Sequence, residues 1–86
     1  LVLMTADGRQ PSSPELAAWL QNQLEQYGEL AFLIGGPVGF DPATAAAAHE
    51  RLALSRLTLP HELARVVLLE QLYRAFTIIH GEPYHK

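Results

Sequence analysis

The sequence predicts an α/β fold in which a small parallel sheet is flanked by helices. Three apolar runs, at residues 1–5, 30–34 and 52–54, alternate with segments that have helical spacing. Strands of a parallel sheet are covered on both faces, so they read as continuous apolar runs, and the helices between them supply the crossover connections. A length of 86 residues allows one domain, over residues 1–86.

Helix signals organise the chain after the first apolar run. Residues 6–9 read as a turn because Asp-Gly is a turn dipeptide. Ser12 and Glu15 have the spacing of a capping box and predict a helix over residues 13–27, which Gly28 ends. One face of this helix is apolar except for Gln23, and its other members are Leu16, Trp19, Leu20, Leu24 and Tyr27.

A glycine-rich segment, Gly-Gly-Pro-Val-Gly at residues 35–39, directly follows the second run. Such a segment between a strand and a helix either lets a ligand approach the backbone or makes a tight turn, and both readings stay open. Asp41 is the expected N-cap of a helix over residues 42–50, with Pro42 in its first position. The third strand and a loop at 55–60 precede the longest helix, at 61–79.

The helix at residues 61–79 is apolar around almost its whole circumference. A helix on the surface of a monomer shows one apolar stripe, so a second apolar face indicates a second partner. We therefore expect a homodimer formed through this C-terminal helix. The expected contributors are Leu72, Tyr73, Phe76 and Ile79.

Composition excludes several classes of function. The absence of cysteine excludes a disulfide scaffold and a thiolate metal site, and it fits a reducing compartment such as the cytoplasm. The four histidines lack metal-ligand spacing, so no metal site is expected. A net charge of −3 predicts no long-range attraction to nucleic acid. The longest uncharged run, residues 30–40, is too short to cross a membrane.

Several segments occur together, in the same order, in one family. The segments are Leu-Ile-Gly-Gly-Pro at 33–37, Leu-Ser-Arg-Leu-Thr-Leu-Pro-His at 54–61, Arg65, Glu70, Leu-Tyr-Arg-Ala at 72–75 and Pro-Tyr-His at 83–85. This set resembles the C-terminal half of the large-subunit ribosomal RNA pseudouridine N3-methyltransferases of the SPOUT superfamily. The resemblance implies a trefoil knot near the C-terminus. It also implies that residues 1–86 are a single truncated or minimal SPOUT methyltransferase domain, although Val38 stands where the family usually has an acidic residue.

The resemblance implies that S-adenosyl-L-methionine binds between three backbone segments. Each segment follows the carboxyl end of a predicted strand, where open α/β sheets bind ligands. Carried over to this sequence, the cofactor-binding residues are Met4, Gly35, Gly36, Ser55, Arg56, Leu57, Thr58, Leu59 and Pro60.

The reaction implied by the resemblance is methyl transfer to N3 of a pseudouridine in ribosomal RNA. The nitrogen must lose its proton, so a base or a polarising group helps. Tyr84 and His85 are the catalytic candidates, provided that the tail folds over the cleft; without the resemblance, a disordered chain end is the favoured reading. His61, Arg65 and Lys86 are the candidates for RNA contact.

Three interpretations of the function are thus in competition. The first is an S-adenosyl-L-methionine-dependent RNA methyltransferase domain, or a remnant that still binds the cofactor. The alternative is a minimal knotted homodimeric scaffold without catalytic activity, which the net acidity and the absent N-terminal half favour. A third reading is a different small nucleotide-binding α/β module.

Overall fold

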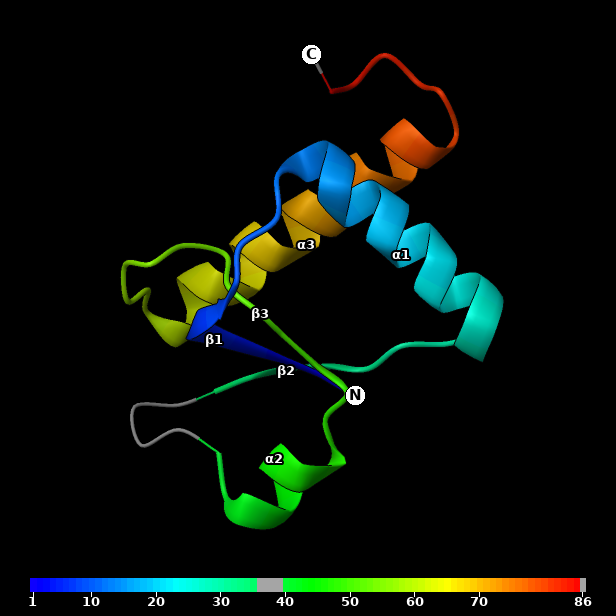
Figure 1. Ribbon diagram of the computed structural model, residues 1–86. Helices are drawn as coiled ribbons and strands as arrows, with labels where there is room; N and C mark the ends of the chain where they lie inside the picture. Colours follow the sequence, from blue (N-terminus) through cyan, green and yellow to red (C-terminus); the bar gives the residue numbers. More distant parts are fainter. Residues whose placement is uncertain (36–39, 86) are drawn as a thin grey trace.

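The computed structural model describes residues 1–35 and 40–85. Its elements are β1 (Val2–Arg9), α1 (Ser13–Tyr27), β2 (Phe32–Ile34), α2 (Pro42–Ala47), β3 (Glu50–Leu52) and α3 (His61–Ile79) (Figure 1). The three strands form one sheet in the order β2-β1-β3, and both pairings are parallel. The predicted α/β class is confirmed, and the helices at 13–27 and 61–79 have the predicted bounds. The trefoil knot stays a prediction.

The first strand occupies the centre of the sheet. Val2 pairs with Phe32 on one side and with Glu50 on the other, and Met4 pairs in the same way with Ile34 and Leu52. Val2 and Met4 belong to the buried core cluster, and Leu3 is fully buried as well. Both faces of β1 are therefore covered, as its continuous apolar run predicts.

The turn predicted at residues 6–9 is wrong, because β1 continues to Arg9. The pairing with β3 is irregular there, since both Met4 and Arg9 face Leu52. The backbone N–H of Ala53 donates to the carbonyl of Arg9 over 2.8 Å. A Cβ atom on Gly8 would lie 2.7 Å from the Leu52 carbonyl carbon. The glycine of the Asp-Gly pair thus serves a close approach of two strands and not a chain reversal.

The other two strands and α2 differ from their predicted bounds. The ladder of β2 contains only Phe32–Ile34, and that of β3 runs over Glu50–Leu52 where 52–54 was predicted. The apolar run at 52–54 extends past the paired strand, because Ala53 is buried although it follows the last paired residue of β3. The helix predicted at 42–50 ends at Ala47. Ala48 already has an extended backbone, and the backbone N–H of His49 donates to the Leu1 carbonyl.

The core lies between the sheet and two helices. Figure 1 shows α1 and α3 on one side of the sheet and α2 on the other. The capping box between Ser12 and Glu15 is formed and starts α1, and Gly28 ends the helix with a φ of 80°. The core cluster joins the strands to these two helices and contains Val2, Met4, Leu16, Ala17, Leu20, Leu52, Leu68 and Ala75.

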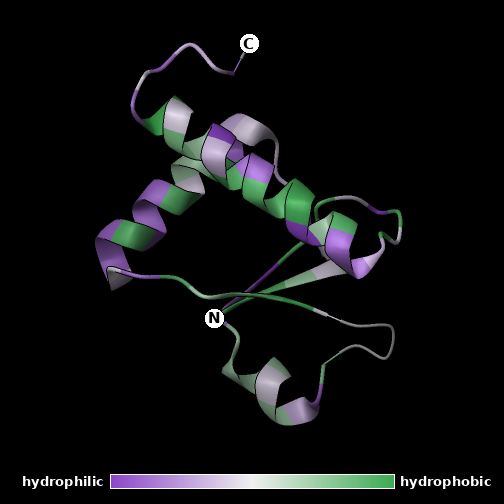
Figure 2. Ribbon diagram, turned by 180° about the vertical axis from the view of Figure 1, so that it is seen from behind, coloured by the Kyte–Doolittle hydropathy of each residue, from purple (hydrophilic) through white to green (hydrophobic). Residues whose placement is uncertain are grey.

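The longest helix, α3, is apolar on two sides. Ala64, Leu68 and Ala75 are buried, while several large apolar side chains elsewhere on the helix are exposed. Figure 2 shows hydrophobic residues recurring along α3. Within the described parts of the chain, no helix combines the length and apolar character that a membrane span requires.

Candidate functional site

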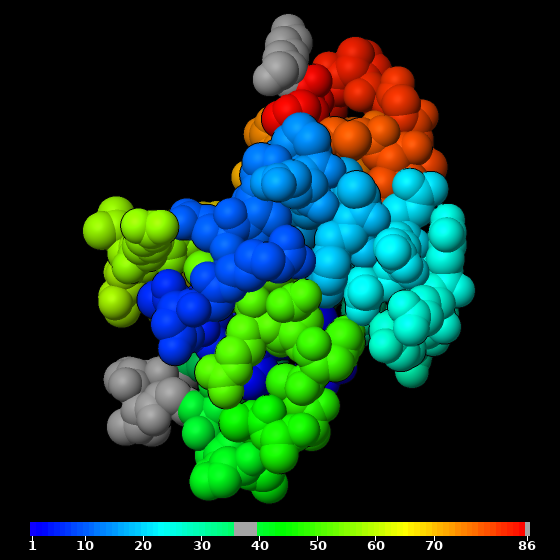
Figure 3. Space-filling view, in the orientation of Figure 1, coloured from blue at the N-terminus to red at the C-terminus, as the bar shows by residue number. Residues whose placement is uncertain are grey.

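A cavity of about 400 Å³ lies at the carboxyl end of the sheet. Its walls come from the middle of β1, the end of β2, the segment before α2, β3 and the loop after it, and single residues of α2 and α3. This volume is within the range of small-molecule sites, and the position at the strand ends is where open α/β sheets bind ligands. The space-filling view shows the loop after β3, in yellow-green, beside the blue N-terminal strand (Figure 3).

Most of the predicted cofactor residues meet in this cavity. Of the nine, six line it, namely Met4, Gly35, Ser55, Leu57, Thr58 and Leu59. Arg56 and Pro60 belong to the same loop but are not among the lining residues. Gly36 lies outside the residues that the structure describes. Met4 and Ser55, which are about fifty residues apart in sequence, therefore line the same cavity.

The apolar part of the cavity includes a residue that sequence reasoning missed. Phe40 lines the cavity together with Ile34 and Leu54. A Cβ atom on Gly35 would lie 2.9 Å from two carbon atoms of the Phe40 ring, so only glycine lets the ring pack against this backbone. Leu57 is 74% exposed although it lines the cavity, so its side chain offers apolar surface to a ligand and not to the core.

Two charged residues of the cavity were also missed by the sequence analysis. Asp7 belongs to the turn predicted at residues 6–9, and no motif in the sequence marks Arg51. Both line the cavity, and both are exposed. Asp7 bonds the Thr5 hydroxyl. This hydrogen bond lowers the pKa of the Asp7 carboxyl below its ordinary value, and the charge of Arg51 lowers it further.

The candidates for RNA contact lie on α3 next to the cavity. His61 and Arg65 are four residues apart at the start of the helix and are both exposed. Residues at this spacing share one side of a helix. Ala64, between them, is part of the cavity wall. Lys86 lies outside the described residues.

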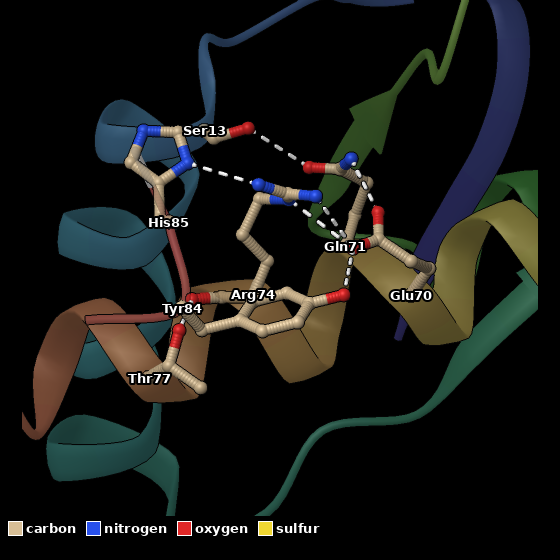
Figure 4. Close-up of polar contacts among 7 residues, drawn as sticks. All are labelled: Ser13, Glu70, Gln71, Arg74, Thr77, Tyr84 and His85. Atoms are coloured by element: carbon tan, nitrogen blue, oxygen red, sulfur yellow. Dashed lines mark hydrogen bonds and ion pairs between the residues drawn. The ribbon is translucent and has the colours of Figure 1, made fainter. Parts of the chain in front are cut away.

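The tail after α3 is bound to the helix by a polar network (Figure 4). Glu70 Oε2 accepts hydrogen bonds from Arg74 Nε at 3.2 Å, Arg74 Nη2 at 2.9 Å and the Tyr84 hydroxyl at 3.1 Å. Arg74 also lies 5.0 Å from the centre of the Tyr84 ring and 3.2 Å from His85 Nδ1. The ring of Tyr73 meets that of Tyr84 edge to face, at 4.9 Å between centroids. The reading of a disordered chain end does not describe these residues.

The same network reaches the first helix. Glu70 Oε1 accepts from the Gln71 side-chain amide at 2.8 Å, and the Ser13 hydroxyl donates to Gln71 Oε1 at 2.9 Å. The bond to Glu70 raises the pKa of the Tyr84 phenol above its ordinary value. Tyr84 and His85 are not among the residues that line the cavity, and their role in catalysis stays a prediction.

The geometry can now be compared with known proteins. A family model described as "Predicted SPOUT methyltransferase" matches residues 1–85. Three similar proteins are each named "Ribosomal RNA large subunit methyltransferase H". The protein from Deinococcus deserti is 55% identical over 100% of this chain and 60% of its own length. The protein from Geotalea daltonii is 52% identical over 99% of this chain and 56% of its own length. The protein from Gemmatimonas aurantiaca is 57% identical over 86% of this chain and 48% of its own length. The chain thus spans about half to three fifths of the length of these relatives.

Proposed function

Because the chain belongs to the SPOUT methyltransferase family, we propose that it binds S-adenosyl-L-methionine in the cavity and serves methyl transfer to ribosomal RNA. The observation that carries the proposal is the meeting of Met4, Gly35 and the loop at 55–59 around one cavity. The names of the similar proteins support ribosomal RNA of the large subunit as the substrate. The resemblance adds N3 of a pseudouridine as the methylated atom.

The residues of the cavity fit this cofactor. Phe40, Leu57 and Leu59 offer apolar surface to a purine and a thioether chain, and Gly35 lets the Phe40 ring lie close to the backbone. When bound, the cofactor supplies a methyl group on a positively charged sulfur. The carboxylate of Asp7 provides a favourable field for positive charge in the same cavity.

On the RNA side, the residues of this chain orient the nucleotide and assist loss of a proton. Phe40, Leu57 and Leu59 would hold the cofactor, which would supply the methyl group that replaces the N3 proton, and that proton would be released to solvent. A hydrogen-bond donor at a carbonyl beside N3 stabilises the negative charge that develops there. His61 and Arg65 support contact with RNA as the proposal requires, because both are exposed at the start of α3 and Ala64, between them, lines the cavity.

Binding of S-adenosylhomocysteine, measured by calorimetry, tests the proposal. The parent chain is expected to bind, and Leu57→Ser is expected to lower the affinity about three- to tenfold, because it removes apolar contact area. Leu57 is exposed, so the fold should not change. Tyr27→Ser is the matched control, since Tyr27 is also exposed but does not line the cavity. No binding by the parent at millimolar ligand would contradict the proposal.

We also propose that two copies of the chain pair through α3. Five large apolar side chains are exposed along this helix at intervals of three or four residues, namely Leu63, Val66, Leu69, Tyr73 and Phe76. An apolar stripe of this kind is typical of an interface. Of the contributors expected from the sequence, Tyr73 and Phe76 face outward, whereas Leu72 and Ile79 pack against the core cluster. A homodimer is also compatible with the alternative function, a scaffold without catalytic activity.

A further inference from the structure

Two opposite charges face the same cavity from neighbouring strands. Asp7 comes from β1 and Arg51 from β3, and the two strands pair directly. The other described residues that line the cavity are uncharged. The cavity therefore has a large apolar part, one carboxylate and one guanidinium, and the charge of Arg51 contributes to lowering the pKa of Asp7.

The guanidinium of Arg51 is available to a ligand. Its neighbour in the chain, Glu50, forms an ion pair with Arg9 at 3.4 Å across the strands. The second oxygen of Glu50 accepts only from the Arg51 backbone, at 3.1 Å. Within residues 1–35 and 40–85, no carboxylate lies within salt-bridge distance of the Arg51 side chain.

The carboxylate of Asp7 is held in place before any ligand arrives. The Thr5 hydroxyl donates to Asp7 Oδ1, and both residues line the cavity. Each carboxylate oxygen has two lone pairs and the side chain is exposed, so Asp7 can accept further hydrogen bonds from a ligand. Neither charged side chain is buried, which means that binding a ligand need not break an internal ion pair.

We propose that Arg51 and Asp7 bind the two charged groups of the cofactor's amino-acid end, Arg51 its carboxylate and Asp7 its ammonium group. The proposal rests on the proposed function. A zwitterionic α-amino acid needs one partner of each sign, and a guanidinium matches a carboxylate with two parallel hydrogen bonds. The apolar walls around Phe40 and Leu57 remain for the adenosine part. The charged pair thus selects a nucleoside that carries an amino acid over one that does not.

The test compares two ligands that differ only in this end. S-adenosylhomocysteine carries the amino acid, and 5′-methylthioadenosine keeps the adenosine and the sulfur without it. Arg51→Gln and Asp7→Asn are expected to weaken S-adenosylhomocysteine roughly tenfold and to leave 5′-methylthioadenosine unchanged within about twofold. Arg9→Gln is the matched control, because Arg9 is an exposed arginine of β1 that does not line the cavity. It should alter neither affinity.

The outcomes separate the inference from the proposed function. Equal loss for both ligands, or no loss for either, in a folded Arg51→Gln chain would overturn the charged-pair assignment and leave cofactor binding standing. A parent chain that binds neither ligand would overturn both. Asp7→Asn keeps the shape of the side chain and its bond to Thr5, so its circular dichroism and melting temperature should match those of the parent.

Discussion

Nη1 of Arg74 lies 3.2 Å from Nδ1 of His85. A guanidinium can only donate, so Nδ1 accepts this hydrogen bond and the neutral His85 ring carries its proton on Nε2. Tyr84 in turn donates its hydroxyl hydrogen to Glu70. The single hydroxyl hydrogen of Tyr84 is thus engaged by Glu70, which leaves Nε2–H of the neutral His85 ring as the free donor of the two residues predicted as catalytic. This arrangement suits polarisation of a carbonyl on the substrate better than removal of a proton.

Glu70 is expected to hold the tail in place. Replacing it by glutamine removes the charge that attracts Arg74 and Tyr84, so amide hydrogen exchange at residues 82–85 should become faster. Because the ion pair is partly exposed, the free energy of unfolding should fall by less than about 1 kcal/mol. Glu25→Gln on α1 is the control. Unchanged exchange in the tail of Glu70→Gln would show that Glu70 does not hold it.

Acid should destabilise the start of α1. The Glu15 carboxylate accepts from the Ser12 backbone N–H at 2.8 Å, and this bond lowers the pKa of Glu15 in the folded chain. A lowered folded pKa stabilises the fold above the unfolded value, and the contribution is lost as the pH falls through the folded value. The melting temperature should therefore drop below about pH 5, where Glu15 of the unfolded chain begins to take up its proton while the folded chain still holds the carboxylate.

The matched variant for this prediction is Glu15→Gln, which has no charge to lose. Its melting temperature should lie below that of the parent at about pH 6, and the difference should shrink as the pH approaches about 3. Asp41, whose pKa is lowered by its bond to the Thr44 backbone, is unchanged in this variant, so some acid sensitivity remains. A constant difference across the whole pH range would disprove the role of the Glu15 charge.

Gly8→Ala should be clearly destabilising. The new methyl group would lie 2.7 Å from the Leu52 carbonyl carbon and 2.8 Å from the Leu52 nitrogen, and these are backbone atoms of a paired strand that cannot turn away. We expect a loss of about 1–3 kcal/mol in the free energy of unfolding, measured by urea denaturation. Ala6→Ser, in the same strand but exposed, should cost little. A Gly8→Ala chain as stable as the parent would show that the two strands separate easily.

Leu69→Glu should leave the chain monomeric. Leu69 is 58% exposed in the middle of α3, so a charge there is tolerated by the monomer but not by an apolar interface. Light scattering coupled to gel filtration should show the parent as a dimer and this variant at half its mass. Gln21→Glu, which adds the same charge to an exposed position of α1, should remain a dimer. A monomeric parent at micromolar concentration would contradict the pairing through α3.

The helices were easier to predict than the strand ends and the cavity. Local signals such as the Ser12–Glu15 capping box decide where a helix starts, and both long helices have the predicted bounds. The extent of β1 depends on which backbone comes to lie beside Gly8, and that neighbour is more than forty residues away in sequence. Gly35 and the loop at 55–59 follow the ends of β2 and β3, whereas Met4 lies within β1, and all three segments were predictable through the resemblance. Asp7 and Arg51 were not, because no local pattern relates a residue of β1 to one of β3.

The central place of β1 has a consequence for how the chain folds. Val2 pairs with Phe32, thirty residues onward, and Met4 with Leu52, forty-eight residues onward. Contacts this distant in sequence close large loops before they give any stability, which slows folding. During synthesis, the strand made first must wait for both of its neighbours. A nascent chain that has not reached Glu50 presents an open, apolar strand edge, the kind of edge on which other chains pair and aggregate.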